Sequence, residues 1–493
     1  MMLSAAEYEK IIAQGYTYVP VVKTLSIKPS EAHAIDIYRR LAGQAHSYLF
    51  ESISHNRQWG RYSIIGLPCE QHIHIAGKTI QWHKPQGVET IHCDNPLHWL
   101  ERHLADRRMP DHKDLPGGKN LPPFLGGLVG FFGYDTVRYI EPVLPAAKPA
   151  VLDIPDIFLL VSTQLLIVDH YDNCLHIIVC ACRHEKDAWH NACPRISEIE
   201  ASLQAQTSQP LPTMTQTPGE VDFVSSFGED AYKQAVERAR DYICRGEVMQ
   251  LVLSQCLRTP FTGHPMALYK RLVQVNPSPY MFYLHLGNFH VVGSSPEILV
   301  RAGRRQLTVR PIAGTRKRGK TKAEDCALEN ELLADKKELA EHLMLIDLGR
   351  NDLGRVCKTG SVKVSEQMIV ERYSHVMHIV SHVNGERPKK TTCLDILRAT
   401  FPAGTVSGAP KVRAMELIDE LEPIKRQVYS GAIGYLSWSG FMDTAIAIRT
   451  AVICDGQLYL QAGAGIVYDS VPENEWEETL NKARAMMQVV GGA

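Results

Sequence analysis

Residues 444–483 have the sequence TAIAIRTAVICDGQLYLQAGAGIVYDSVPENEWEETLNKA, in which the hydrophobic pattern changes from strand-like to helical. The segments 444–456 and 457–463 are apolar runs typical of β-strands, and 473–489 is expected to be a helix. Similar runs predict further strands at 62–67, 158–168, 175–182, 248–259, 281–287, 289–294, 297–302 and 431–438, and further helices at 196–206, 230–247, 323–349, 393–400 and 410–421. Strand clusters interrupted by helices, without strict alternation, predict an α+β fold with large antiparallel sheets.

The composition is that of an ordinary globular protein. Of 493 residues, 45% are hydrophobic and 22% charged, with a net charge of -1, which argues against binding to nucleic acid or an anionic membrane. No apolar run approaches the roughly 20 residues of a membrane span. No signal peptide is expected, and the twelve cysteines, without a Cys-x-x-Cys motif, indicate reduced thiols in a cytoplasmic protein.

A change in composition divides the chain into two regions. The segment TSQPLPTMTQTPGE (207–220) is rich in Thr and Pro and has no hydrophobic periodicity, which is typical of a linker. We therefore predict an N-terminal region at 1–206, a linker at 207–221 and a C-terminal domain at 222–493.

Two pairs of glutamates have the spacing that places both carboxylates on one face of a helix. Glu338 and Glu341 lie in KKELAEHLMLIDL, and Glu475 and Glu478 lie in PENEWEETLNKA. If the two helices face each other, the four carboxylates form a site suited to a hard cation such as Mg²⁺. The alternative is that both pairs are solvated helix faces, because lysines flank each of them.

Two glycine-rich segments could bind anions. FPAGTVSGAPKVRAMELI (401–418) runs into a helix whose first N–H groups could hold an anion, or it is a plain turn. It is not a nucleotide-binding P-loop, because Pro410 precedes Lys411 where Gly-Lys-Ser/Thr is needed. In the second segment, Gly463 and Gly465 form a turn that leaves N–H groups open to a ligand carboxylate.

Three basic residues add to these segments. Lys482 follows Glu478 by four residues, either as a surface pair or as a cation presented beside a metal site. Arg449 ends an apolar strand and needs a carboxylate partner, which is either structural or a ligand. VRPIAGTRKRG (309–319) places a Gly-Thr pair in a turn before a basic run.

Together these segments resemble the chorismate-utilising enzyme family over the whole chain, most densely at 222–490. The resemblance is carried by GEVMQLVLSQ, NPSPYMFY, GSSPEIL, RPIAGTRKRG, ELAEHLMLIDLGRNDLGRV, VERYSHVMHIVS, FPAGTVSGAPKVRAMELI, YSGAIGY, DTAIAIRT and AGAGIVYDSVPENEWEETLNKA. It implies two large, mostly antiparallel sheets packed as a sandwich, with helices on the outside.

The resemblance also implies roles for individual residues. Mg²⁺ would be bound by Glu341 and Glu478, with Glu338 and Glu475 close by or acting through water. The residues implied to hold chorismate are Gly314, Thr315, Tyr429, Arg449, Gly463, Ala464, Gly465 and Lys482. Glu297 is similar to the family's general acid for loss of the ring hydroxyl. His378 is similar to the histidine implicated in the final elimination.

Two positions separate the reactions of this family. Where isochorismate and salicylate synthases have a water-activating lysine, this chain has Gln250, which cannot act as a base. Where many aminodeoxychorismate synthases have a nucleophilic lysine, it has Ala313. The resemblance therefore favours attack by ammonia at C2 and pyruvate elimination to give anthranilate. The alternatives are the large subunit of an aminodeoxychorismate synthase and a non-catalytic regulatory homologue that binds tryptophan or chorismate.

The resemblance further implies a partner and an inhibitor. No Gly-x-Cys-x-Gly segment is present, so a separate glutamine amidotransferase subunit would supply ammonia. YLFESISHNRQWGRYSIIG (48–66) resembles part of a tryptophan feedback site that contains Ser52 and is completed by Pro279, Tyr280 and Met281. Phe50 departs from the usual Leu of this motif, which bears on affinity. Without the resemblance, Glu51-Ser52 would be a cap that ends a strand.

Overall fold

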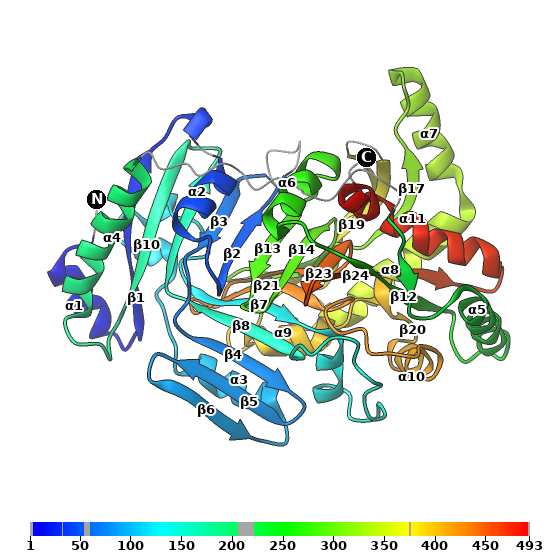
Figure 1. Ribbon diagram of the computed structural model, residues 1–493, viewed down its shortest axis with the longest axis horizontal. Coiled ribbons are helices and arrows are strands. Elements are labelled where there is room, and N and C mark those ends of the chain that lie inside the picture. Colours follow the sequence, from blue (N-terminus) through cyan, green and yellow to red (C-terminus); the bar gives the residue numbers. More distant parts are fainter. Residues whose placement is uncertain (1–2, 32, 54–59, 206–220, 374–375, 492–493) are drawn as a thin grey trace.

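The protein folds into two large β-sheets packed face to face. The structure is a computed structural model that describes residues 3–31, 33–53, 60–205, 221–373 and 376–491. Within these residues each sheet has twelve strands, and every paired strand is antiparallel to its neighbour. The predicted α+β fold with two antiparallel sheets and outer helices is confirmed (Figure 1).

The first sheet has the order β1-β10-β9-β3-β2-β13-β14-β23-β24-β12-β11, with β20 beside β12. Its strands are β1 (Tyr18–Ser26), β2 (Ser47–Glu51), β3 (Tyr62–Gly66), β9 (Gln164–Asp169), β10 (Cys174–Cys182), β11 (Val224–Ser225), β12 (Gln250–Pro260), β13 (Tyr280–His285), β14 (Phe289–Ser295), β20 (Gly408–Ala409), β23 (Thr450–Cys454) and β24 (Gln457–Ile466).

The second sheet has the order β17-β19-β16-β15-β22-β21-β7-β8-β4-β5-β6, with β18 beside β19. Its strands are β4 (His72–Ala76), β5 (Thr79–Lys84), β6 (Gly87–His92), β7 (Gly127–Phe132), β8 (Ile157–Ser162), β15 (Ile298–Ala302), β16 (Gln306–Val309), β17 (Ile312–Lys317), β18 (Lys363–Arg372), β19 (Val376–Glu386), β21 (Ala432–Ser437) and β22 (Met442–Ile446).

Helices pack on the outer faces of both sheets. They are α1 (Ala5–Ile12), α2 (Ala34–Leu41), α3 (Pro96–Ala105), α4 (Ala188–Gln204), α5 (Glu229–Cys244), α6 (Pro265–Val275), α7 (Lys322–Ala334), α8 (Lys336–Gly354), α9 (Cys393–Thr400), α10 (Lys411–Leu421) and α11 (Pro472–Gly491). Helices α1, α2, α4, α5, α6, α10 and α11 contact the first sheet, and α7, α8 and α9 contact the second. Within the described residues no helix combines the length and apolarity needed to cross a membrane.

The core lies between the inner faces of the sheets. Phe289 of β14 packs edge-on against Phe158 of β8, with ring centroids 5.8 Å apart. The buried hydroxyl of Tyr48 on β2 lies 2.8 Å from that of Ser162 on β8, so the polar tip of this core tyrosine is satisfied. All six residues of β8 are buried, which explains why this part of the sequence is almost entirely apolar.

Both sheets contain strands from the two sides of the predicted linker. β2 pairs with β13 in the first sheet, and β7 pairs with β21 in the second. The predicted linker at 207–221 falls almost entirely outside the described residues. The division into two regions stays a prediction from composition, but the N-terminal and C-terminal parts of the chain share one sandwich.

Three elements differ from the sequence prediction. The strand expected at 158–168 is β8 and β9, which belong to different sheets. The helix expected at 323–349 is two helices, because Asp335 interrupts it and caps α8 by accepting from the N–H groups of Lys337 and Glu338. The single strand expected at 444–456 is β22 and β23, separated by a short turn that contains Arg449 with a φ of 50°. Hydrophobic periodicity alone does not locate the interruptions at Asp335 and Arg449, since apolar residues recur within a few positions on both sides of each.

A buried ion pair joins strand β12 to two other segments of the chain. The guanidinium of Arg426 donates to both carboxylate oxygens of Glu422, and their side chains are 1% and 4% exposed. Arg426 also donates to the carbonyl oxygens of Val252 on β12 and Val406, each at 2.6 Å. Glu422 accepts from the N–H and hydroxyl of Ser254, both at 2.8 Å. Every charged group here is therefore satisfied within the protein.

We predict that Arg426→Ala destabilises the fold by about 3–5 kcal/mol, because it leaves the Glu422 carboxylate buried without a counter-charge. The midpoint of urea denaturation should fall accordingly. Lys78 forms a pair with Asp94 that is 70% and 95% exposed, so Lys78→Ala serves as the matched control and should barely move the midpoint. Equal midpoints for Arg426→Ala and the control would contradict the structural role of the buried pair.

Candidate active site

The two glutamate pairs lie at the starts of two helices that approach each other. Glu338 and Glu341 occupy the first turns of α8, and Glu475 and Glu478 those of α11. The positive charge of Lys337 on α8 is close enough to Glu475 to favour a lower pKa of that carboxyl. Figure 1 shows α11 beside α5 and the end of β24, which contact it. The starts of the two helices therefore lie near each other, and a shared metal site between them stays a prediction.

These carboxylates fit a hard cation. Burial, followed by the neighbouring Glu341, raises the pKa of Glu338, and burial with the neighbouring Glu478 raises the pKa of Glu475. The Oε2 atom of Glu475 is buried without a hydrogen-bond partner. A divalent cation would offset this repulsion. Among the described residues no three of these glutamates place their oxygens within 4.8 Å of one another, so the set suits a cation that takes further ligands from substrate and water.

Gln250 on β12 lies against the same group. Its Nε2 atom donates to Glu341 Oε1 at 3.3 Å, and its buried Oε1 atom has no partner. A Cβ at Gly465 would lie 2.4 Å from Gln250 Nε2, so only glycine leaves room for this side chain. The amide therefore occupies the position beside the candidate metal ligand.

Gly463 and Gly465 belong to strand β24 and not to the turn that the sequence analysis predicts. Gly463 on β24 lies opposite Ser254 on β12. The N–H of Ser254 points away from β24 and donates to Glu422. Because opposed residues of antiparallel strands alternate between bonded and non-bonded pairs, Gly463 and Gly465 turn their N–H groups away from β12. Ala464, between them, directs its backbone to β12. Among the described strands none pairs with the open side of the two glycines, so these N–H groups can still receive a carboxylate.

Lys482 links the glycine strand to the glutamates. Its ammonium lies 2.7 Å from Glu478 Oε1 and donates to the carbonyl oxygen of Gly463 at 3.0 Å. Tyr429 and Glu341 are also near enough to contribute to the raised pKa of this ammonium. A Cβ at Gly463 would lie 2.8 Å from the hydroxyl of Tyr429, so these two residues are in close contact. Five of the predicted residues thus converge at one place.

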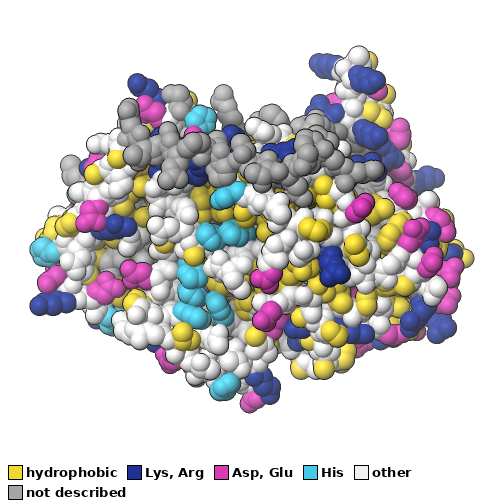
Figure 2. All heavy atoms as spheres, viewed as in Figure 1, with side chains coloured by type: hydrophobic (Ala, Val, Ile, Leu, Met, Phe, Trp, Pro, Cys, Tyr) yellow, Lys and Arg dark blue, Asp and Glu magenta, His cyan; other side chains and the backbone are white. Residues whose placement is uncertain are grey.

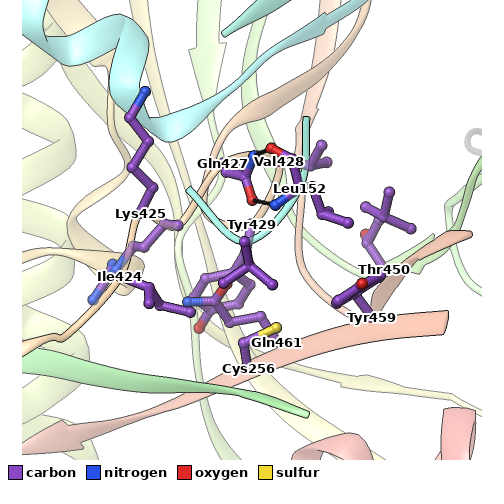
Figure 3. Close-up of a pocket in the computed structure, with 13 residues that line it drawn as sticks. Leu152, Cys256, Ile424, Lys425, Gln427, Val428, Tyr429, Thr450, Tyr459 and Gln461 are labelled. Carbon is purple, nitrogen blue, oxygen red and sulfur yellow. Dashed lines mark hydrogen bonds between the residues drawn. The ribbon is translucent and has the colours of Figure 1, made fainter. Parts of the chain in front are cut away.

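Tyr429 also borders a small cavity on its other side. The cavity measures about 30 Å³ and is lined by Leu152, Cys256 and Gln461, among others. Figure 3 shows Gln427 and Leu152 joined by two hydrogen bonds across its rim, at 3.1 and 2.7 Å. Such a volume holds a water molecule but no six-membered ring. It is a packing space on the side of Tyr429 that faces away from Gly463.

Gly314 and Thr315 form a bulge in strand β17, where the sequence analysis predicts a turn. The register between β17 and β19 shifts between Ala313 and Thr315, and Gly314 has a φ of 66°, which favours glycine. The bulge places the Thr315 hydroxyl and the Gly314 carbonyl oxygen each 3.0 Å from Nδ1 of His378. Gly314 also adjoins Glu338, whose Oε2 would lie 3.2 Å from an added Cβ.

His378 and Glu297 are both held in their neutral forms. Burial, together with the positive charge of Arg449, lowers the pKa of His378 to about 4. Burial raises the pKa of Glu297 to about 8, and the stabilising effects of Thr405, Arg310 and Arg449 offset only part of this rise. At neutral pH the site therefore presents a protonated carboxylic acid and an unprotonated imidazole.

Comparisons with known proteins agree with this arrangement. The sequence profile of a family described as chorismate binding enzyme matches residues 47–488. The chain belongs to the chorismate-binding enzyme family. It is 46% identical to anthranilate synthase component 1 of Neisseria meningitidis serogroup B and 48% identical to that of Pseudomonas aeruginosa, in each case over 99% of this chain and 98% of the relative. The family resemblance inferred from the sequence is confirmed.

Solved structures show the same fold. The crystal structure of anthranilate synthase component I from Streptococcus pneumoniae superposes with a TM-score of 0.77 at 36% identity, covering 94% of this chain and 98% of the other. The menaquinone-specific isochorismate synthase of Escherichia coli superposes with a TM-score of 0.70 at 20% identity, over 98% of both chains. At that identity the second likeness concerns the fold alone.

The sequence analysis of this chorismate-binding enzyme missed two buried groups at the site. Arg310 is 2% exposed and lies close to both Glu297 and His378. Thr405, in the glycine-rich segment before α10, adjoins Glu297. Arg310 had no local signal, because an arginine is rarely buried unless it is paired, and its partners lie in other segments. Thr405 had none, since its position depends on how the 401–410 segment folds back.

A larger cavity lies apart from these residues, between strands of the two sheets. It measures about 400 Å³, and its lining includes Ser52, Pro279, Tyr280 and Met281, which are the residues of the predicted feedback site, together with Phe50. β2 and β13 are paired neighbours, with Glu51 opposite Met281, which brings two segments distant in sequence to one wall. The volume is within the range of small-molecule sites.

The protonation of Glu297 is directly measurable. Because its carboxyl is neutral below its pKa of about 8, we predict an infrared carboxylic acid band at pH 7 that disappears as the pH rises through 8. The band should be absent from Glu297→Gln and present in Glu477→Gln, which changes an exposed carboxylate of α11. A band already lost at pH 6 would contradict the assignment.

Proposed function

We propose that the chain is the chorismate-converting subunit of an anthranilate synthase, a lyase that forms anthranilate and pyruvate from chorismate and ammonia in tryptophan biosynthesis. The observation that carries the proposal is the neutral pair Glu297 and His378, placed near the same arginine and adjoining two glutamate pairs. The names of the full-length relatives support it.

The substrate is a dianion, and the chain offers matching groups. Arg449 is half-buried near Glu297, and among the described residues no protein carboxylate is bonded to its guanidinium, so its charge is available to a substrate carboxylate. Lys482 and the N–H groups of Gly463 and Gly465 are suited to the second carboxylate. Mg²⁺, held by Glu341 and Glu478 with Glu338 and Glu475 nearby, would supply charge compensation for the ring carboxylate.

The protonation states suit the two steps of the reaction. In the first step the nitrogen of ammonia bonds to C2, the C4–O bond breaks, and Glu297 donates the proton with which the hydroxyl leaves as water. The new C2-ammonium then loses one proton, which restores the acid form of Glu297. In the second step a proton leaves C2, the bond from C3 to the enolpyruvyl oxygen breaks, and the ring becomes aromatic as pyruvate forms. A neutral His378 can accept the C2 proton, whereas a protonated one cannot.

Two neutral side chains support ammonia as the nucleophile. Gln250 lies beside Glu341, where a base able to activate water would be needed for isochorismate formation. Ala313 precedes the bulge in β17 and offers no amine to attack the ring. Both positions favour anthranilate over the alternative products of the family.

A partner and an inhibitor complete the proposal. Ammonia would come from a glutamine amidotransferase subunit, as the component 1 name of the relatives supports. Tryptophan would bind in the 400 Å³ cavity, with Ser52, Pro279, Tyr280 and Met281 as its contacts. All twelve cysteines lie in the described residues and are free thiols, which supports a reducing compartment such as the cytoplasm.

The fold offers a physical link between that cavity and the reaction. Tyr280, in the cavity wall, pairs with Ser295, two residues before Glu297. Asp443 of β22 accepts from the Tyr280 hydroxyl at 2.8 Å, and the end of β22 donates from Ile446 N to Glu297 O at 3.0 Å. A ligand that shifts β13 against β22 would displace the general acid, which requires only that tryptophan prefer the less active arrangement.

The proposal predicts the product. The purified chain, given chorismate, Mg²⁺ and an ammonium salt at alkaline pH, should form anthranilate and pyruvate, identified by chromatography. Aminodeoxychorismate or isochorismate instead would overturn the assignment. If the chain alone forms no product, the assay is repeated with glutamine and an amidotransferase subunit, and a second failure would favour a binding protein.

In the productive assay Glu341→Gln or Glu478→Gln should abolish Mg²⁺-dependent turnover, whereas Glu477→Gln on the exposed face of α11 should not.

The cavity assignment predicts that Ser52→Ala and Met281→Thr weaken tryptophan inhibition, because each removes a contact from the cavity wall. Inhibition curves measured at fixed chorismate should shift to higher tryptophan concentration. Uninhibited turnover, largely unchanged, reports that the variants fold. Ser202→Ala, on the exposed surface of α4, is the matched control. Curves that coincide for all three variants and the parent chain would rule out this cavity as the feedback site.

A further inference from the structure

Three histidines converge near one end of the second sheet. The residues that this sheet contributes to the candidate active site lie toward its opposite end. His72 and His74 are alternate residues of β4, so their side chains point to the same face, and His83 of β5 lies directly opposite His72. One ring nitrogen from each lies within 4.8 Å of the other two. β4 and β5 are near one end of the sheet order, whereas β17 and β19, which contain Gly314 and His378, are at the other.

Each of these rings keeps a buried nitrogen without a hydrogen-bond partner. The unpartnered atoms are His72 Nδ1, His74 Nε2 and His83 Nε2. His72 is only 7% exposed, and its ring stacks on that of His46 with centroids 4.0 Å apart. Phe158 underlies the cluster, with its ring 4.2 Å from that of His74. A buried nitrogen that neither donates nor accepts is costly, and three together need an explanation.

Two explanations are available for these rings. The first is a stack of neutral imidazoles packed on Phe158 for their apolar area alone, which leaves the three nitrogens unsatisfied. The second is a ligand that bonds to all three nitrogens at once.

We propose that His72, His74 and His83 form a binding site for one divalent transition-metal ion, with Zn²⁺ as the ion they suit best. Three imidazoles without a carboxylate select a borderline ion of this kind and not Mg²⁺. Three histidines would leave a fourth tetrahedral position for water, and His74 and His83 are only partly buried. Binding of one ion at about 2.0–2.1 Å would draw the nitrogens, which lie within 4.8 Å of one another, to about 3.3 Å apart.

The surface agrees with an accessible site. Figure 2 shows histidine side chains gathered in a column on one face, over the region where Figure 1 places β2 to β5. The ion would cross-link two neighbouring strands at one end of the sheet. It would therefore contribute to the stability of this end and take no part in the reaction proposed for the glutamate site.

A second cluster of metal-binding residue types does not meet the same conditions. Asp169, Cys174 and His176 also lie within 4.8 Å of one another. Both carboxylate oxygens of Asp169, however, already accept from Arg61, and one of them accepts from backbone N–H groups as well. The pair Cys174 and His176 is in contact at 3.4 Å. This cluster is satisfied internally.

The test is equilibrium dialysis of the full chain against Zn²⁺, after removal of metals by a chelator and with excess Mg²⁺ present to compete at the carboxylates. We expect one Zn²⁺ per chain. His83→Ala should weaken this binding at least about tenfold, because loss of even an outer-shell partner of a metal ligand costs that much. His92→Ala, an exposed histidine on the neighbouring strand β6, is the matched control and should bind as the parent does.

Two further measurements separate this site from the others. Glu478→Gln should retain the bound Zn²⁺, and His83→Ala should keep the parent's turnover. Co²⁺ in place of Zn²⁺ should give the intense visible absorption of a four-coordinate site in the parent and in His92→Ala, and lose it in His83→Ala. Zn²⁺ binding that is unchanged in His83→Ala, or a parent chain that binds no Zn²⁺, would overturn the proposal.

Discussion

The buried pair of Glu422 and Arg426 is the constraint on which the site depends. Neither charge can leave its partner without being stranded in the protein interior, so the segments bonded to the pair are fixed relative to one another. Those segments are β12, the loop that ends at Val406 and the turn that leads to Tyr429. Through them one ion pair sets the positions of Gln250, of Thr405 beside Glu297, and of the tyrosine against the glycines of β24. A pair of hydrophobic side chains would fill the same volume but would form no hydrogen bonds to hold these three segments in place.

The electrostatic design of the site follows from where each titratable group is buried. Glu297 and His378 are deeply buried near one arginine, and burial drives both to the neutral form. The glutamates of α8 and α11 adjoin one another, and burial together with this mutual repulsion raises the pKa of Glu338 and Glu475, so a cation bound among them would relieve the repulsion. One fold thus holds a neutral carboxylic acid, a neutral imidazole and a group of carboxylates, with each protonation state set by environment and not by residue type.

The sequence predicted the class of fold, most of the strands and the residues that gather at the site. It did so because the strands are strongly apolar and because the motifs lie in order along the chain. It failed where backbone geometry decides the outcome. Gly314 and Gly463 were both expected in turns, but one is a bulge and the other part of a strand, and in both cases the missing Cβ serves a neighbouring side chain. The burial of Arg310 and the place of Thr405 depend on contacts between segments far apart in sequence, which local patterns do not contain.

The sharing of both sheets by the two ends of the chain has a consequence for its synthesis. Glu51 of β2 finds its partner in Met281 of β13, about 230 residues later. At the usual rate of translation, that interval is roughly ten to fifty seconds. During this time the nascent N-terminal strands can pair among themselves, as β2 does with β3, but the β2 edge that β13 will cover stays open to other chains. The ribosome-bound chain therefore passes through a long period in which protection of one strand edge decides between folding and aggregation.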